Sequence, residues 1–421
     1  MPNIILRDQE HHSIGVRSNP PILLTTSKSR MSQRALSDGT PGTSKPGLPK
    51  RSRFRKLIFA ALVVASVLSA IEIALRLCGW PRGTFRGAFS TSTGIWEPGY
   101  DAVLDLGPFS YRVQANAMGF RGPELRRGLD AARLRIVCLG DSVTDGFYVD
   151  NPDTYPVILN DLLSRRGLDV EVINAARGGG SINKALVILR DRVLSLQPDI
   201  AVLTFVTNDL ADLRGRSPRE LLSVALEGGE RTPWIETLLT RCAIAESVTD
   251  MALRFRSPHY RREDRSGAQP VQGRDRYVIP GNDRYEENAR TFLELWKGVD
   301  GRLLRESLDD EMSHALDTYC DVLRELARQC QENDIRLLFT YFPAYPEVYL
   351  AECPDAFRRM LRARVEAQGV EFLDLTPALR EGSKDGPLHL APIDFHPNPR
   401  GYRVIAATIA ERLEELQWLT N

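Results

Sequence analysis

From residue 133 onward, short continuous apolar runs alternate with longer stretches whose apolar residues recur at helical spacing. A strand-length run without polar alternation is typical of a strand that is buried on both faces of a parallel sheet. The alternation of strands with helices predicts an α/β fold with a right-handed, doubly wound parallel sheet. The predicted strands cover 134–139, 170–173, 200–205, 335–342 and 370–375, and the predicted helices cover 155–166, 185–196, 316–331, 354–368 and 404–416.

A different pattern precedes the predicted sheet: residues 57–75 are apolar almost throughout, with Glu72 as the only charge. At about 1.5 Å per residue a helix of this length reaches about 28 Å, close to a hydrocarbon thickness of about 30 Å. We expect a single transmembrane helix over 57–77. A cleaved secretory signal is the alternative, although the long leader 1–56 argues against it. The positive-inside tendency places the N-terminus in the cytoplasm, because basic residues precede the apolar run: Arg51, Arg53, Arg55 and Lys56.

Charge separates the N-terminal segment from the rest of the chain. Lys+Arg and Asp+Glu number 55 each, so the net charge gives no argument for a nucleic-acid partner. Residues 1–56 nevertheless carry far more Lys and Arg than Asp and Glu, and they are rich in Ser, Pro, Gly and Thr. Such a segment buries too little apolar surface to offset its ordering entropy, and we expect it to be disordered.

The six cysteines show no CxxC or Cys/His metal spacing, so no metal site is expected.

The expected organisation is a disordered basic segment (1–56), a transmembrane helix (57–77), a lead-in segment (78–132) and an α/β domain (133–421). The α/β domain contains a less regular stretch at 211–310, with helical pieces and a strongly charged loop. This stretch is either an insertion above the sheet edge that shapes substrate choice or a solvated surface. The chain after Trp80, including the α/β domain, would lie outside the cytoplasm.

Polar residues directly follow three of the predicted strands. The first strand stops at Gly140 and is followed by Ser142, the second runs into a loop that contains Gly179, and the third delivers Asn208. Because the carboxyl ends of parallel strands share one edge, where ligands bind in open α/β sheets, we expect these residues to lie close together. A strand-to-helix turn capped by Ser142 or Asp141 is the simpler alternative. A phosphate-binding loop is disfavoured because GK[ST] and GxGxxG are absent there.

A histidine and an aspartate near the end of the chain supply the groups that a nucleophilic serine requires. Asp394 and His396 lie just before the last predicted helix. A serine hydroxyl is a weak nucleophile until a base takes its proton. The imidazole base in turn needs a carboxylate that fixes its tautomer and stabilises the imidazolium. The pair can supply the base and the carboxylate, whereas a lone histidine is more often structural.

Four separated motifs resemble those of the SGNH (GDSL-type) hydrolase superfamily: GDSVTDG at 140–146, NAARGG at 174–179, TND at 207–209 and DFHPNPRGY at 394–402. The resemblance implies a flavodoxin-like α/β fold, preceded here by the membrane helix. The basic leader, this helix and the segment NAMGFRGPE are also similar to membrane-anchored bacterial members.

The resemblance also implies roles for individual residues. Ser142 would be the nucleophile, His396 the base and Asp394 its orienting partner. The oxyanion hole would consist of the backbone N–H groups of Ser142 and Gly179 and the side-chain amide of Asn208.

Two positions depart from the family pattern. Val206 stands where the family usually has a glycine, and the spacing Asp-x-His replaces Asp-x-x-His at Asp394 and His396. Asp374, at the end of a predicted strand, is an alternative orienting carboxylate for the histidine.

The resemblance implies a membrane-tethered serine esterase that acts through an acyl-enzyme, without a metal or an organic cofactor. Its substrate would carry a short acyl group, such as an O-acetyl group on an envelope glycan or lipid, because tethering favours substrates near the membrane. Two alternatives share the fold. One is an O-acyltransferase that passes the acyl group to a sugar hydroxyl, and the other is a non-catalytic module that binds glycan.

Overall fold

The computed structural model describes most of the chain beyond residue 49. The described residues are 50–78, 95–105, 109–126, 134–219, 221–222, 242–244, 247, 277, 279–295, 299–304 and 307–419. The chain divides into two compact units, Met1–Ile71 and Glu72–Asn421. The segment 1–49, which is predicted to be disordered, and most of the predicted insertion 211–310 lie outside the described residues.

Helix α1 (Lys50–Leu77) contains the predicted membrane segment. Among the described residues one helix, Phe54–Leu77, is long and apolar enough to cross a membrane. The prediction of an apolar helix over 57–77 is therefore confirmed. A signal sequence near the N-terminus can also form a long apolar helix, so the membrane span and the side on which each end lies stay predictions.

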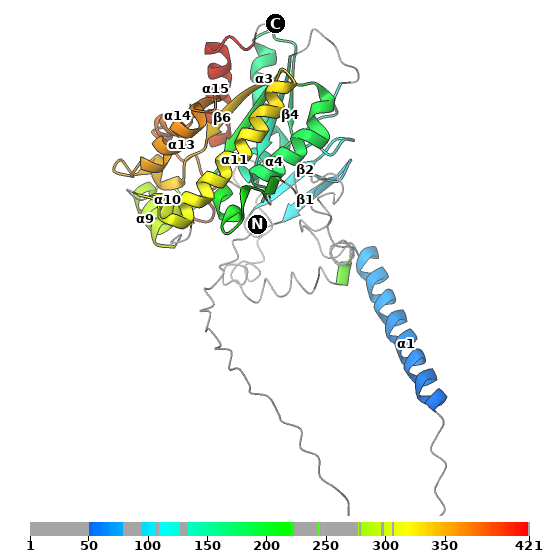
Figure 1. Ribbon diagram of the computed structural model, residues 1–421. Helices are drawn as coiled ribbons and strands as arrows, with labels where there is room; N and C mark the ends of the chain where they lie inside the picture. Colours follow the sequence, from blue (N-terminus) through cyan, green and yellow to red (C-terminus); the bar gives the residue numbers. More distant parts are fainter. Residues whose placement is uncertain are drawn as a thin grey trace, which may run out of the picture. The chain divides into compact units, whose positions relative to one another are not determined.

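Five parallel strands form the central sheet of the second unit, in the order β4-β3-β5-β6-β7 (Figure 1). Their bounds are Leu134–Gly140 for β3, Val170–Asn174 for β4, Ile200–Phe205 for β5, Arg336–Tyr341 for β6 and Glu371–Asp374 for β7. The chain passes from β3 to β4 on one side and then returns to the other side of β3 to form β5. The carboxyl ends of β3 and β5 therefore flank a topological switch point, where open α/β sheets bind ligands. The predicted parallel sheet is confirmed.

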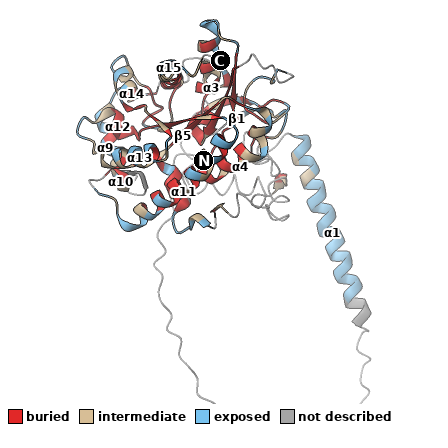
Figure 2. Ribbon diagram, turned by 45° about the horizontal axis from the view of Figure 1, so that its top comes forward, coloured by how far each residue is buried: buried red, intermediate tan, exposed pale blue. Residues whose placement is uncertain are grey.

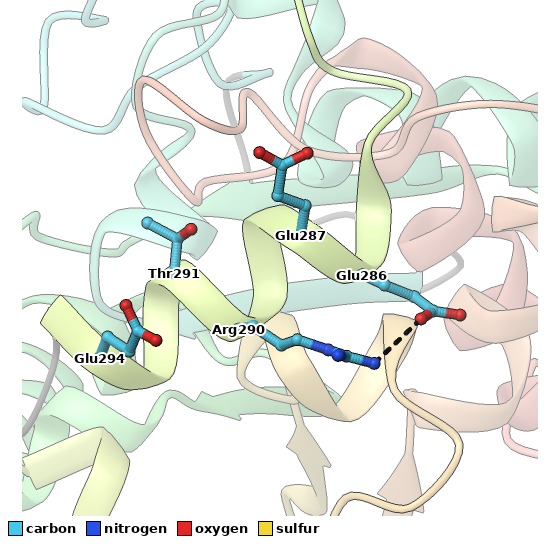
Figure 3. A pocket seen from close by; sticks show the side chains of 5 residues that line it. All are labelled: Glu286, Glu287, Arg290, Thr291 and Glu294. Atoms are coloured by element: carbon cyan, nitrogen blue, oxygen red, sulfur yellow. Dashed lines mark hydrogen bonds and ion pairs between the residues drawn. The ribbon is translucent and has the colours of Figure 1, made fainter.

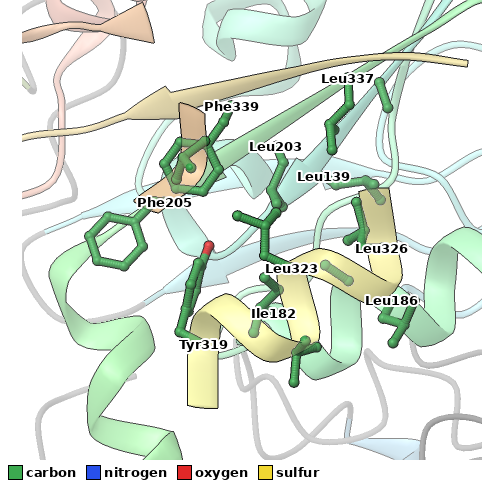
Figure 4. Packing of buried hydrophobic residues seen from close by; sticks show 14 of the residues in the cluster. Leu139, Ile182, Leu186, Leu203, Phe205, Tyr319, Leu323, Leu326, Leu337 and Phe339 are labelled. Carbon is green, nitrogen blue, oxygen red and sulfur yellow. The ribbon is translucent and has the colours of Figure 1, made fainter. Parts of the chain in front are cut away.

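Helices cover both faces of this sheet, as a doubly wound fold requires. Figure 4 shows part of the apolar cluster on one face, where strand residues such as Leu203 and Phe339 pack against Leu323. In Figure 2 the sheet is buried, whereas the helices expose their outer sides. One face carries α4 (Ile182–Ile188), α11 (Asp310–Glu332) and α13 (Ala356–Glu366), and the other carries α3 (Tyr155–Arg165), α14 (Thr376–Ser383) and α15 (Pro399–Glu415). Among the described residues, the second unit also contains the α-helices α2 (Ser142–Asp145), α9 (Tyr285–Leu295), α10 (Val299–Leu303) and α12 (Tyr345–Tyr349).

The lead-in segment forms an antiparallel hairpin of β1 (Asp101–Asp105) and β2 (Ser110–Gln114). Burial alternates along β2, with Tyr111 and Val113 buried, which is the pattern of a strand that packs on one face only. These side chains belong to an apolar cluster that also contains Phe147, a residue of the loop after α2. The hairpin is thus packed on the segment that follows Ser142.

Three predicted helices differ from the structure by more than two residues at an end, and one of them, α11, begins at Asp310 instead of residue 316. The predicted helix 185–196 is wrong in its second half, because α4 passes into a π-helical turn at Leu189–Val193 and a 3-10 turn at Leu194–Leu196. Helix α15 begins before the predicted residue 404. The side chain of Asn398 accepts hydrogen bonds from the N–H groups of Arg400 and Gly401 and caps the helix. This polar residue precedes the apolar residues from which the helix was predicted.

Candidate active site

The strand β3 ends at Gly140, and the backbone turns sharply into the short helix α2, whose first residue is Ser142. Gly140 has a φ of +149°, and a Cβ there would lie 2.5 Å from Thr144 Oγ1 and 2.9 Å from the Thr204 carbonyl oxygen. Only glycine fits such a site. The turn therefore places the Ser142 hydroxyl at the carboxyl end of the central strand, with the residue 8% exposed.

His396 approaches Ser142 from the loop before α15. Its Nε2 atom lies 2.8 Å from Ser142 Oγ, although the two residues are 254 positions apart in the sequence. Its Nδ1 atom lies 2.5 Å from Asp394 Oδ1, and the same carboxylate oxygen accepts the backbone N–H of His396 at 2.8 Å. An ionised carboxylate can only accept, so Nδ1–H donates a hydrogen bond to it, and Nε2 is left as the acceptor for the Ser142 hydroxyl. The shorter Asp-x-His spacing is thus compatible with contact between the two side chains.

The Asp394 carboxyl is held in its ionised form. Burial acts to raise its pKa, but the charge of His396 and the two hydrogen bonds from that residue outweigh burial and lower the pKa below its usual value. A carboxylate that stays ionised can stabilise a positive charge on the imidazole ring.

The alternative carboxylate, Asp374, lies elsewhere. Its Oδ1 atom accepts the backbone N–H of Thr376 at 2.8 Å, and its Oδ2 atom lies 3.3 Å from Arg358 Nε. Asp374 therefore caps a helix and pairs with an arginine at the end of β7.

The residues predicted to form an oxyanion hole lie close together at the end of β3. Two of them, Gly179 and Asn208, donate hydrogen bonds to the carboxylate of Asp141. The N–H of Gly179 donates to Asp141 Oδ1 at 2.5 Å, and that of Gly180 donates to the same atom at 3.1 Å. The Nδ2 atom of Asn208 donates to Asp141 Oδ2 at 2.6 Å. The side chain of Asp141 makes no capping hydrogen bond to α2, so the prediction that it caps this helix is wrong. Its part in the site was missed.

Val206 fits the loop that carries Asn208. Its φ of −128° and ψ of 146° are those of ordinary extended backbone, which any residue adopts. Its N–H donates to Asp209 Oδ2 at 3.2 Å, and its side chain packs against the apolar cluster on one face of the sheet. The glycine that the family usually has is therefore not required here by the backbone conformation.

A buried network beneath the turn that carries Ser142 was also missed in the sequence. Arg121, 2% exposed, donates to the carbonyl oxygens of Asp145 and Gly146 at 2.8 Å each and to that of Val149 at 2.6 Å. The Asp145 carboxylate accepts Trp96 Nε1–H at 2.9 Å. Burial raises the pKa of Asp145 to about 6, although the charge of Arg121 opposes it. The lead-in segment thereby fixes the turn that carries Ser142.

Two aromatic rings lie against the histidine. Phe147 stacks on His396 with ring centroids 5.7 Å apart, and Tyr148 meets it edge-on at 5.3 Å. Tyr148 has a φ of 65°, a left-handed conformation that is costly for a bulky residue and is concentrated at functional sites. One described residue of the 211–310 stretch contacts the loop that carries Tyr148, because Tyr277 Oη donates to the Tyr148 carbonyl oxygen at 3.4 Å.

A second histidine, His389, is close in sequence but has a different environment. It is buried, and its Nδ1 atom lies 3.0 Å from Tyr349 Oη. Burial, assisted by the charge of His396, lowers the pKa of His389 to about 3. It therefore stays neutral near pH 7 and lies apart from the contacts of Ser142.

A surface hollow on α9 is lined by Glu286, Glu287, Arg290, Thr291 and Glu294 (Figure 3). All five come from one helix, and Arg290 pairs with Glu286 at 3.3 Å. Exposed charges of this kind are ordinary on a helix surface, and none of them belongs to the predicted site. Within the ranges that the structure describes, no group of three or more His, Cys, Asp and Glu residues could hold a metal ion.

Comparisons with known proteins give a sequence relative and several matches among solved structures. An arylesterase from Vibrio mimicus is 30% identical over 89 residues, which make up 21% of this chain and 44% of that relative. The chain thus spans less than half the length of this curated relative. Among solved structures, the acetyl xylan esterase AlAXEase is 13% identical with a TM-score of 0.35, covering 66% of this chain and 100% of its own. TesA is 12% identical with a TM-score of 0.37, covering 67% and 99%.

The family comparison covers the sheet and the loops at its carboxyl edge. The GDSL-like Lipase/Acylhydrolase family matches residues 138–404, which is more than half of the chain. The matched range runs from β3 into α15 and includes Ser142, Asn208 and His396. The chain therefore belongs to the GDSL-like lipase/acylhydrolase (SGNH hydrolase) family, a family of ester-cleaving enzymes.

Proposed function

We propose that this chain is a serine esterase in which Ser142 is the nucleophile, His396 the general base and Asp394 its orienting carboxylate. The observation that carries the proposal is the line of contacts from Ser142 Oγ to His396 Nε2 at 2.8 Å and from His396 Nδ1 to Asp394 Oδ1 at 2.5 Å. These distances are those of a nucleophile, a base and the group that orients the base.

The reaction then has two steps. Ser142 Oγ attacks the ester carbonyl while His396 Nε2 takes the hydroxyl proton, and the imidazolium passes this proton to the departing alkoxide. The product of this step is an acyl ester on Ser142. Water attacks the acyl ester with His396 again as base, and the carboxylic acid leaves as the serine regains its proton.

Negative charge on the carbonyl oxygen requires donors that are already in position. We assign this task to the N–H groups of Ser142 and Gly179 and to the side-chain amide of Asn208. Such donors act in a site that largely excludes water, and the loss of one typically costs about 10²–10³ in turnover.

A short acyl group is the proposed substrate feature. Ser142 is 8% exposed, and Phe147 and Tyr148 lie against His396, which supports a narrow acyl site. We expect kcat/KM to fall along a series of p-nitrophenyl esters from acetate to octanoate. A maximum of kcat/KM at octanoate would contradict the preference for a short acyl group. The natural substrate is proposed to be an ester on an envelope glycan or lipid.

The proposed location is a membrane, with α1 as anchor, the N-terminus in the cytoplasm and the catalytic domain outside. The apolar segment Phe54–Leu77 and the basic residues before it support this orientation. Protease added to intact spheroplasts should digest the catalytic domain. Full protection in spheroplasts, with digestion only after lysis, would contradict the orientation.

The nucleophile is tested with the full-length chain in mild detergent and p-nitrophenyl acetate as substrate. We expect the kcat of Ser142→Ala to fall about 10⁴-fold or more, because among the described residues no other hydroxyl lies within hydrogen-bond distance of His396 Nε2. The matched control is Ser195→Ala, since Ser195 is exposed and donates only to the carbonyl oxygen of Arg192. A Ser142→Ala variant that keeps the wild-type rate would sink the proposal.

A further inference from the structure

The carboxylate of Asp141 occupies the place where an oxyanion is expected to bind. Its two oxygens accept hydrogen bonds from Gly179 N–H, Gly180 N–H and Asn208 Nδ2, at 2.5, 3.1 and 2.6 Å. Its Oδ2 atom also lies 3.4 Å from Ser142 Oγ, and Asp141 itself is 1% exposed. Two of the three donors assigned to the oxyanion therefore already bind an anion.

The N–H of Gly179 cannot donate fully to two anions at the same time. A backbone N–H has one hydrogen, and that of Gly179 is directed at Asp141 Oδ1. The neighbouring N–H of Gly178 donates to Asp145 Oδ2 at 3.0 Å. The three successive N–H groups of residues 178–180, here called the glycine loop, therefore all donate to the carboxylates of Asp141 and Asp145. Successive N–H groups that converge in this way form an anion-binding nest. Here the nest is filled from within the chain.

The two carboxylates differ in what else holds them. Asp145 is fixed from behind by Trp96 Nε1–H at 2.9 Å and by Arg121 at 3.8 Å. Within the described part of the chain Asp141 pairs with no Lys or Arg side chain. Its side-chain hydrogen bonds go to two of the proposed oxyanion donors, Gly179 and Asn208, and to the N–H of Gly180 and the hydroxyl of Ser142. An oxygen anion bound to Gly179 and Asn208 would take two of the three N–H donors that hold Asp141, whereas Trp96 and Arg121 would continue to hold Asp145.

We propose that Asp141 is a resident anion that closes the oxyanion hole of the unliganded enzyme and turns away when an ester oxygen takes its donors. This inference rests on the proposed function, with Ser142 as nucleophile. A neutral ester carbonyl is a weaker acceptor than a carboxylate, whereas the tetrahedral oxyanion is a comparable one. The exchange therefore favours the transition state over the bound ester, which is the direction that raises kcat rather than lowering KM.

The competing role is that of a permanent positioning group, in which Asp141 stays in place and holds Asn208 and the glycine loop in the active arrangement. The two roles predict opposite effects of a free carboxylate on the full-length variant Asp141→Ala. If Asp141 is a closing anion, formate that binds in the vacated nest competes with the substrate. If Asp141 is a positioning group, formate replaces the missing carboxylate and restores activity.

We expect formate to raise the KM of Asp141→Ala for p-nitrophenyl acetate at least about fivefold, with kcat unchanged, and to change wild type less than about twofold. Pivalate at the same concentration is the control for size and ionic strength, because its three methyl groups cannot enter the nest. Activation by formate, or no response to it, would overturn the proposal. Circular dichroism and a thermal melt establish that the variant is folded.

A second measurement needs no variant. Diethyl p-nitrophenyl phosphate reacts with a nucleophilic serine: the Ser142 Oγ–P bond forms, p-nitrophenolate leaves, and His396 takes the serine proton. In a crystal structure of this adduct we expect the phosphoryl oxygen on Gly179 N–H and Asn208 Nδ2, with Asp141 turned away. An adduct on Ser142 with Asp141 still on Gly179 and Gly180 overturns the closing role alone. No adduct on Ser142 overturns the proposed nucleophile and the closing role together.

Discussion

The substitution Asp394→Asn tests how the carboxylate assists His396, and the geometry makes an unusual prediction for it. One oxygen of Asp394 accepts both the backbone N–H of His396 at 2.8 Å and its Nδ1–H at 2.5 Å. The amide oxygen of asparagine can occupy this position and keep both hydrogen bonds. The ring would then retain its tautomer, and what is lost is the negative charge beside the imidazolium.

The magnitude follows from that charge. A carboxylate and an imidazolium about 4 Å apart attract by about 4 kcal/mol at an effective dielectric constant of about 20. The side chains of His396 and Asp394 are 22% and 24% exposed, so water screens the pair in part. About 2–3 kcal/mol remains, which corresponds to a loss of about 10² in kcat at about 1.4 kcal/mol per factor of ten.

The companion variant Asp394→Ala removes the acceptor oxygen as well as the charge. The ring can then adopt the tautomer with the proton on Nε2, which cannot accept the serine proton, and we expect kcat to fall about 10³–10⁴-fold. The assay is kcat for p-nitrophenyl acetate, with active sites counted by the diethyl p-nitrophenyl phosphate burst. The control Asp374→Asn should stay within about twofold of wild type, because Asp374 contacts Thr376 and Arg358 instead.

Equal losses in Asp394→Asn and Asp394→Ala would refute the argument from the shared oxygen, since they would mean that the amide does not preserve the tautomer. Wild-type rates in both variants would remove Asp394 from the mechanism. A large loss in Asp374→Asn with an intact fold would return that residue to consideration as the orienting carboxylate.

Three further predictions address the neighbouring loops and the core. Asn208→Ala should lower kcat about 10²–10³-fold with little change in KM, because the amide acts on charge that develops in the transition state; a rise in KM alone would contradict this. Val206→Gly should not raise activity and should lower the free energy of unfolding by about 1–2 kcal/mol in urea, since Val206 is in extended backbone and packs on the core. Burial raises the pKa of Glu347 to about 7 from 4.5, so its stabilising contribution is complete below pH 4.5 and is lost as the pH rises through 7. Wild type should therefore lose about 3 kcal/mol of stability relative to Glu347→Gln between pH 4.5 and pH 8, and parallel pH curves would contradict this.

The strands were predictable because burial on both faces gives each of them a short, mostly apolar run between turn signals. The helix boundaries were less accessible. Helix α15 starts at Pro399 because the polar side chain of Asn398 caps it, and apolar periodicity carries no record of such a cap. The π-helical turn at Leu189–Val193 keeps its apolar residues buried, so the pattern does not distinguish it from an α-helix.

The site shows the same division. Ser142, Gly179, Asn208, Asp394 and His396 could be named from the sequence because each follows a predicted strand or precedes the last predicted helix, and motifs mark those positions. The role of Asp141 could not, because a carboxylate beside a turn is ordinarily read as a cap or as a solvated charge. Its partners come from two other loops, and only the folded chain brings their donors to it.

The lead-in segment shows how much of the active site depends on residues outside the matched family range, which begins at 138. Without Arg121 the buried carbonyl oxygens of Asp145, Gly146 and Val149 would each lose a donor, and without Trp96 the Asp145 carboxylate would lose another. Asn174 Nδ2 and the N–H of Val149 would still donate to the carbonyl oxygens of Asp145 and Gly146, at 3.3 and 3.4 Å, and Gly178 N–H to the Asp145 carboxylate. The main cost falls on the Val149 carbonyl oxygen, at about 1–3 kcal/mol for a buried group left unsatisfied, out of a domain stability of about 5–15 kcal/mol. The loss of these donors would therefore loosen the turn that carries Ser142. We therefore infer that 95–126 and the α/β domain fold as one unit, and that the nucleophile depends on the segment before the sheet as directly as on the sheet itself.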